Sequence, residues 1–113
     1  MSKLVKFDQL SPQAKTKAIN DFAAFYVPLY QNNHLEIIGS YDHTGLIWDI
    51  NRNIWTNKFN SEKDIIKLSA KERAKHYAKL LAKIGQKFFN NGNPQKSWQQ
   101  WYHDQYYGLE KGL

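Results

Sequence analysis

The fold class predicted from the sequence depends on residues 35–58, which read LEIIGSYDHTGLIWDINRNIWTNK. Apolar and polar side chains alternate over residues 35–42, which is the pattern of a half-buried strand. Asp42-His43-Thr44-Gly45 has the composition of a hairpin turn, because Gly45 can adopt a positive φ. Residues 46–50 form the expected return strand, Asn51-Arg52-Asn53 a second turn, and Ile54–Lys58 a third strand. The sequence therefore predicts a small antiparallel β-meander across residues 35–58.

The segment before the meander predicts a short strand and a helix. Lys3–Phe7 alternates polar and apolar residues and indicates an edge strand that could join the meander. Ser11-Pro12 is a typical helix start, with a serine cap followed by proline at the first helical position. The apolar spacing predicts a helix from Pro12 to Tyr26, and Pro28 disfavours its continuation.

The segment after the meander predicts further helices. Ser61-Glu62-Lys63-Asp64 is a capping box that opens a short helix, and Ser69-Ala70-Lys71-Glu72 opens the longest one. The apolar face of that longest helix extends to Phe88, and Asn90-Asn91-Gly92 stops it. Asn93-Pro94 starts a last helix that ends near Gly108. We therefore expect an α+β fold in which three to four helices pack with the meander, as a single domain over residues 1–113.

Composition excludes several classes of protein. The chain has no cysteine, so disulfide scaffolds, thiolate zinc sites, iron–sulfur clusters and cysteine nucleophiles are excluded. No apolar run approaches the ~18 residues of a membrane span, and the first residues do not form a secretory signal. We expect a cytoplasmic protein that carries no cofactor.

The positive charge is concentrated in one segment. The net charge is +6, and residues 69–91 hold six cations against one acid. Five lysines in this segment are spaced by four, and we call them the lysine row: Lys71, Lys75, Lys79, Lys83 and Lys87. On one helix they would form a slowly winding stripe of about 24 Å. Like charges four residues apart cost a few tenths of a kcal/mol each, whereas a bound anion would turn that cost into attraction.

The lysine row, with Arg73 beside it, predicts a surface for nucleic acid, a nucleoprotein or an acidic protein. The chain has only two arginines, and specific contacts to guanine favour arginine. Lysine suits phosphate contacts that do not choose a sequence. The alternative is a solvated helix face with no partner.

The last predicted helix has an aromatic face. Its members are spaced by three or four residues: Trp98, Trp101, Tyr102 and Tyr106. They either close the core or form a surface for stacking, for a protein partner or for a homodimer. The sequence leaves these alternatives open.

Catalytic and metal-binding patterns are weak. The four histidines have no zinc-site spacing, and the capping roles of the serines make them poor candidate nucleophiles. A metal-free ribonuclease needs only an acid, a base and cations, which His43, His103, Tyr102 and Arg52 could supply. We expect no metal site and no enzyme, and keep the RNA-cleaving toxin as a second alternative.

The opener Phe7-Asp8-Gln9-Leu10-Ser11-Pro12-Gln13-Ala14-Lys15 resembles the F-[DE]-x-L-S-x-x-A-K start of many small phage and prophage proteins. This resemblance implies a protein of a mobile element. Small phage proteins of this size are often inhibitors of host defence, including anti-CRISPR proteins, or regulators that contact nucleic acid. Many such inhibitors are acidic DNA mimics, and this basic chain does not look like one. The resemblance therefore implies competition for a nucleic acid or for an acidic face of a nucleoprotein enzyme.

Overall fold

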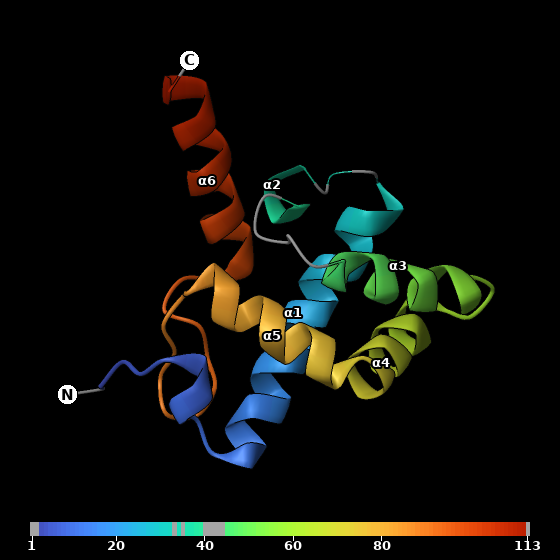
Figure 1. Ribbon diagram of the computed structural model, residues 1–113, viewed down its shortest axis with the longest axis horizontal. Helices are drawn as coiled ribbons and strands as arrows, with labels where there is room; N and C mark the ends of the chain where they lie inside the picture. The colour runs from blue at the N-terminus through green and yellow to red at the C-terminus, as the bar shows by residue number, and fades with distance from the viewer. Residues whose placement is uncertain (1–2, 33, 35, 40–44, 113) are drawn as a thin grey trace.

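The computed structural model describes residues 3–32, 34, 36–39 and 45–112, and this part of the chain is helical (Figure 1). Its elements are the 3-10 helix η1 (Phe7–Gln9) and the α-helices α1 (Pro12–Gln31), α2 (Glu36–Gly39), α3 (Leu46–Thr56), α4 (Glu62–Glu72), α5 (Ala74–Ile84) and α6 (Trp98–Gly112). Within the described residues, β structure is limited to isolated bridges between Val5 and Phe88 and between Phe88 and Pro94. The predicted α+β fold class is therefore wrong.

The predicted β-meander is replaced by helices α2 and α3. The buried residues of α3 recur at helical spacing: Leu46, Ile47, Ile50, Asn53 and Ile54. A short apolar run fits a strand and a helix equally well, and here the helical period buries more aliphatic side chains on one face. The expected strand start at Leu35 and the expected turn at Asp42–Thr44 lie outside the described residues, while Gly45 does adopt a positive φ, of 81°.

The predicted N-terminal strand is reduced to a single bridge. Val5 and Phe88 exchange two backbone hydrogen bonds, each 2.8 Å long. The chain then turns into η1 at Phe7, whose ring packs edge-on against Phe88 with the ring centroids 5.9 Å apart. The bridge thereby fixes the N-terminal segment against the loop that follows α5.

Helix α1 begins as predicted and continues past its predicted end. The Ser11 side chain accepts a hydrogen bond from the Ala14 backbone N–H at 3.2 Å, which confirms the cap. The helix runs through Pro28 to Gln31 instead of ending at Tyr26. Tyr26 and Val27 are fully buried, so core packing outweighs the local preference of residues that precede proline.

The segment predicted to form the longest helix, from Ser69 to Phe88, does not form one helix. It is divided between the end of α4, helix α5 and the loop after α5. The cap at Ser61 is confirmed, since its side chain accepts a hydrogen bond from Asp64 N–H. Ser69, however, lies inside α4, and its hydroxyl hydrogen-bonds to the hydroxyl of Tyr77 on α5. Burial raises the pKa of Tyr77, so this buried phenol stays protonated. The predicted cap at Ser69 is wrong because α4 continues to Glu72 and the chain turns at Arg73.

The end of α5 and the start of α6 also differ from the predicted boundaries. Gly85 takes a left-handed conformation with φ 77° and ends α5 before Phe88. Gly92 lies in the following loop, where a Cβ atom would collide with the backbone oxygen of Ala14. The last helix begins at Trp98 and continues past Gly108 to Gly112.

An aromatic cluster joins the helices into one core. The Phe22 ring lies 4.8 Å from Trp98, 5.9 Å from Tyr77 and 6.0 Å from Tyr26, measured between centroids. Such pairs add about 0.5–1.5 kcal/mol each beyond the buried area. Figure 1 shows α1 behind α5, α3 packed across the pair of α4 and α5, and α6 projecting away from the other helices.

Candidate functional site

The lysine row does not lie on one helix. Lys71 lies near the end of α4, three lysines lie on α5, and Lys87 lies in the loop after α5. The turn at Arg73 and the left-handed Gly85 interrupt the helix on either side of α5. The predicted continuous stripe is therefore wrong, and the part of it on α5 spans about 12 Å.

Helix α5 nevertheless directs its lysines to solvent. Its buried residues are Tyr77, Leu80 and Leu81, and the exposed Lys75, Lys79 and Lys83 lie on the opposite face. Each step of four residues advances by 40° around the helix axis, so the lysines drift gradually around it. All five members of the lysine row are exposed.

Most of the lysine row lacks an acidic partner. No carboxylate of the described residues lies within ion-pair distance of Lys71, Lys75, Lys79 or Lys87. The nearest acid in sequence, Glu72, accepts a hydrogen bond from Asn53 Nδ2 on α3 at 2.8 Å. Within the described residues, these four ammonium groups therefore remain without a neutralising carboxylate.

Two further lysines extend the same spacing backward along α4. Lys63 and Lys67 are exposed, and within the described part of the chain neither has an ion-pair partner. With Lys71 they repeat on α4 the arrangement of the lysines on α5. The sequence could have predicted this extension, because the spacing of lysines by four residues begins at Lys63.

Arg73 has a structural role at the junction of α4 and α5. It is half-buried, its Nε donates to the backbone oxygen of Asp49 at 3.4 Å, and its Nη1 donates to the backbone oxygen of Glu72 at 3.1 Å. These bonds engage carbonyl groups at the end of α4 and on α3. The structure therefore places Arg73 in the seam between helices, apart from the exposed lysines.

The predicted aromatic face of α6 is largely core. Trp98 and Trp101 are only 3% and 7% exposed, and their rings pack against each other at 5.5 Å. Tyr102 is half-buried and contacts the ring of Phe25 at 6.0 Å. Tyr106 is exposed, and its ring centroid lies 6.2 Å from that of Tyr102.

A second surface, which the sequence analysis missed, lies on α3 and the turn after it. Trp48, Trp55 and Phe59 are 63%, 58% and 92% exposed, respectively. The guanidinium carbon of Arg52 lies 5.5 Å from the ring centroid of Trp48, and Lys58 Nζ lies 4.3 Å from that of Trp55 and 5.3 Å from that of Phe59. We call these five residues the aromatic–cation face.

The signal for this face was present in the sequence. Trp48, Arg52, Trp55 and Phe59 are spaced by four, three and four residues, which places them on one side of a helix. The strand interpretation placed Trp48 and Trp55 on different strands and Arg52 in the turn between them, and its last strand ended before Phe59. Because the segment was assigned the two-residue repeat of a strand and not the 3.6-residue repeat of a helix, the sequence analysis missed the most exposed aromatic residues of the described chain.

Helices α3 and α5, which carry the two surfaces, pack against each other. His76 Nε2 on α5 lies 3.2 Å from Asp49 Oδ2 on α3. His76 follows Lys75 in the sequence and Asp49 follows Trp48, so this contact lies near a member of each surface. Asp49 is thereby turned toward His76, and the outer side of α3 retains its cations.

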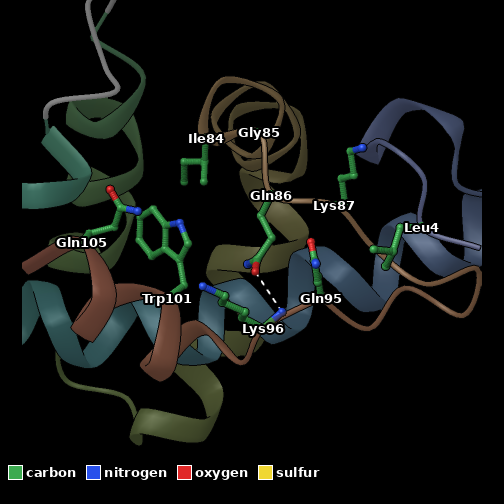
Figure 2. Close-up of a pocket in the computed structure, with 9 residues that line it drawn as sticks. All are labelled: Leu4, Ile84, Gly85, Gln86, Lys87, Gln95, Lys96, Trp101 and Gln105. Atoms are coloured by element: carbon green, nitrogen blue, oxygen red, sulfur yellow. Dashed lines mark hydrogen bonds between the residues drawn. The ribbon is translucent and has the colours of Figure 1, made fainter. Parts of the chain in front are cut away.

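A pocket of about 420 Å³ lies at the far end of the lysine row, beside Lys87 (Figure 2). Gln86 points into it, and its side-chain oxygen accepts a hydrogen bond from the Lys96 backbone N–H at 3.0 Å. The Gln86 amide nitrogen is buried and has no hydrogen-bond partner among the described residues. The ring of Trp101 lines the pocket on the side away from Lys87. The pocket thus combines one unused donor with a nearby ammonium group.

The groups proposed for catalysis do not form a recognisable arrangement in the described chain. Arg52 lies on α3, Tyr102 and His103 lie on α6, and His43 lies outside the described residues. Among the described residues, no three histidine, cysteine or acidic side chains lie together so that they could hold a metal ion.

No family model, curated protein or solved structure matches this chain. Function is therefore inferred from the side chains and their surroundings. The described helices include none with the length and hydropathy that crossing a membrane requires.

Proposed function

We propose that this protein binds nucleic acid through phosphate contacts of the lysine row, without choosing a sequence. The observation that supports the proposal is the lack of an acidic partner at Lys71, Lys75, Lys79 and Lys87 within the described chain. Phosphates that neutralise lysines release condensed counterions, which is the main source of sequence-independent affinity. Lysine contributes this affinity as a point charge and does not read base edges.

The charge pattern supports a partner over a merely solvated face. Like charges four residues apart destabilise α5 by a few tenths of a kcal/mol per pair. Glu72 and Asp49, the acids closest to the row in sequence or across the seam, are both engaged by side chains of other residues. An anion that lies along α5 would remove the repulsion that these acids leave in place.

The role that we propose is that of a regulator or inhibitor acting on a nucleic acid, bare or within a nucleoprotein enzyme, in the cytoplasm of the host cell. The resemblance of the opener to small phage and prophage proteins supports this role. The net charge of +6 favours competition for the nucleic acid over mimicry of it.

The test is the salt dependence of binding. The variant Lys75→Gln/Lys79→Gln removes two exposed charges from α5, and a short DNA duplex labelled with fluorescein serves as the probe. Fluorescence anisotropy at several salt concentrations gives the slope of log K against log salt. If both lysines contact phosphate, the slope becomes shallower by about 1.8, since each contact contributes about 0.9.

The matched control is Lys3→Gln/Lys6→Gln, which removes the same charge from the exposed N-terminal segment. This control lowers the net charge equally, so it separates a local contact from general attraction. Equal slopes for the two variants, or an unchanged affinity of the α5 variant, would reject the proposal.

A further inference from the structure

The aromatic–cation face exposes three large rings that contribute little to the core. Trp48, Trp55 and Phe59 leave most of their surface in water, so they gain little of the stabilisation that burial of an aromatic side chain provides. Helix α3 already buries an aliphatic face through residues such as Ile50 and Ile54, so its outer side needs no apolar residues for folding. Exposed aromatic clusters of this kind mark binding surfaces.

The cations on this face determine which partner it suits. Arg52 lies between Trp48 and Trp55 along α3, and Lys58 lies over the rings of Trp55 and Phe59. Each exposed ring is thus accompanied by a positive charge, and Asp49 is held at the seam by His76. Rings beside cations match a chain of bases and phosphates, because the base faces stack and the phosphates are neutralised.

We infer that the nucleic acid bound by the lysine row is single-stranded, and that its bases stack on Trp48 and Trp55 of α3. This inference rests on the proposed function. Only an unpaired strand presents base faces to side chains on a convex helix, since the bases of a duplex are stacked on one another. The two tryptophans are seven residues apart, which separates them by about 10.5 Å along the helix.

The position of α3 supports this assignment. The His76–Asp49 contact of 3.2 Å and the Asn53–Glu72 hydrogen bond of 2.8 Å pack α3 against the helices that carry the lysines. A strand whose phosphates lie along α5 therefore needs to cross only this seam to bring its bases over α3. The aromatic–cation face and the lysine row then act as parts of one surface.

The experiment compares two probes and two kinds of variant. The probes are an oligothymidylate of about 12 nucleotides, within the site sizes of single-strand binders, and a duplex of the same length. The stacking variant is Trp48→Ala/Trp55→Ala, and Tyr106→Ala is its matched control, because Tyr106 is an exposed aromatic residue on α6. Circular dichroism checks that each variant is folded.

The stacking variant is expected to bind oligothymidylate at least about fivefold more weakly, since one stacked base contributes 1 kcal/mol or more. Its affinity for the duplex and the affinities of the Tyr106→Ala control stay unchanged. Oligothymidylate also quenches the tryptophan emission of the unmodified protein. It does not quench a Trp48→Phe/Trp55→Phe variant, whose remaining tryptophans, Trp98 and Trp101, are buried.

Each other outcome overturns a specific claim. If the Lys75→Gln/Lys79→Gln variant weakens binding and the stacking variant does not, the inference fails and the proposed function stands. If neither probe binds, both fail. If sedimentation shows a dimer that the stacking variant dissociates, the aromatic–cation face is a self-association surface and the inference fails.

Discussion

Helices α3 and α6 are both rich in tryptophan, and they use it in opposite ways. Trp98 and Trp101 of α6 lie in the core, whereas Trp48 and Trp55 of α3 face solvent. Helix α3 also has an aliphatic face, and its tryptophans lie on the other side. In the described part of α6 the aromatic residues themselves form the apolar face. The position of an aromatic residue relative to the aliphatic face therefore indicates whether it packs in the core or faces solvent.

The largest expected effect comes from truncating one tryptophan on each helix and comparing the free energies of unfolding. Trp98→Ala removes a ring that contacts Phe22 at 4.8 Å and should reduce the free energy of unfolding by about 3–5 kcal/mol. Trp55→Ala should change it by no more than about 0.5 kcal/mol. Urea unfolding of both variants measures the difference, and equal losses would show that Trp55 also supports the core.

A second test compares the two faces of α3. Ile50 is fully buried, so Ile50→Ala should reduce the free energy of unfolding by about 2–5 kcal/mol. Arg52→Ala, on the exposed face two residues away, should change it by no more than about 0.5 kcal/mol. Thermal or urea unfolding provides the measurement. A strand in this segment would place both residues on the same face, so similar losses would argue against the helix.

The smallest expected effect concerns the start of α6. Hydrogen bonds from Lys96, at 2.8 Å, and from Gln100 hold the pKa of Asp104 below its usual value. Its ionised form therefore stabilises the fold above the ordinary carboxyl pKa, and this contribution is lost as the pH falls through the lowered pKa. Asp104→Asn should be slightly less stable than the unmodified protein at neutral pH. The gap, measured by urea unfolding across the acid range, should close on acidification, and a gap independent of pH would contradict the assignment.

Local signals in the sequence predicted two of the helix starts correctly. Ser11 and Ser61 cap α1 and α4 because each cap depends only on a serine and a backbone N–H three residues away. The apolar spacing before Pro28 also predicted the buried face of α1, including Phe22. Interactions within one turn of helix are readable from sequence because both partners lie in the same few residues.

The features of the fold that the sequence did not predict depend on contacts between segments distant in the chain. Ser69 had the form of a cap, and its actual partner is the hydroxyl of Tyr77 on another helix. The break at Arg73 is accompanied by hydrogen bonds to backbone carbonyls, one of them on α3. For the candidate site, the exposure of the lysine row was predictable, whereas the aromatic–cation face required the correct helical period for residues 46–56.

The corner at Arg73 divides the lysines into two straight tracks that point in different directions. The lysines on each helix span about 12 Å, from Lys63 to Lys71 on α4 and from Lys75 to Lys83 on α5. Under the proposed function, duplex DNA, with a persistence length of about 150 base pairs, would lie along one track at a time, whereas a flexible strand would bend at the corner and follow both. The stiffness of a polyanion, as much as its charge, then sets how many ammonium groups it neutralises.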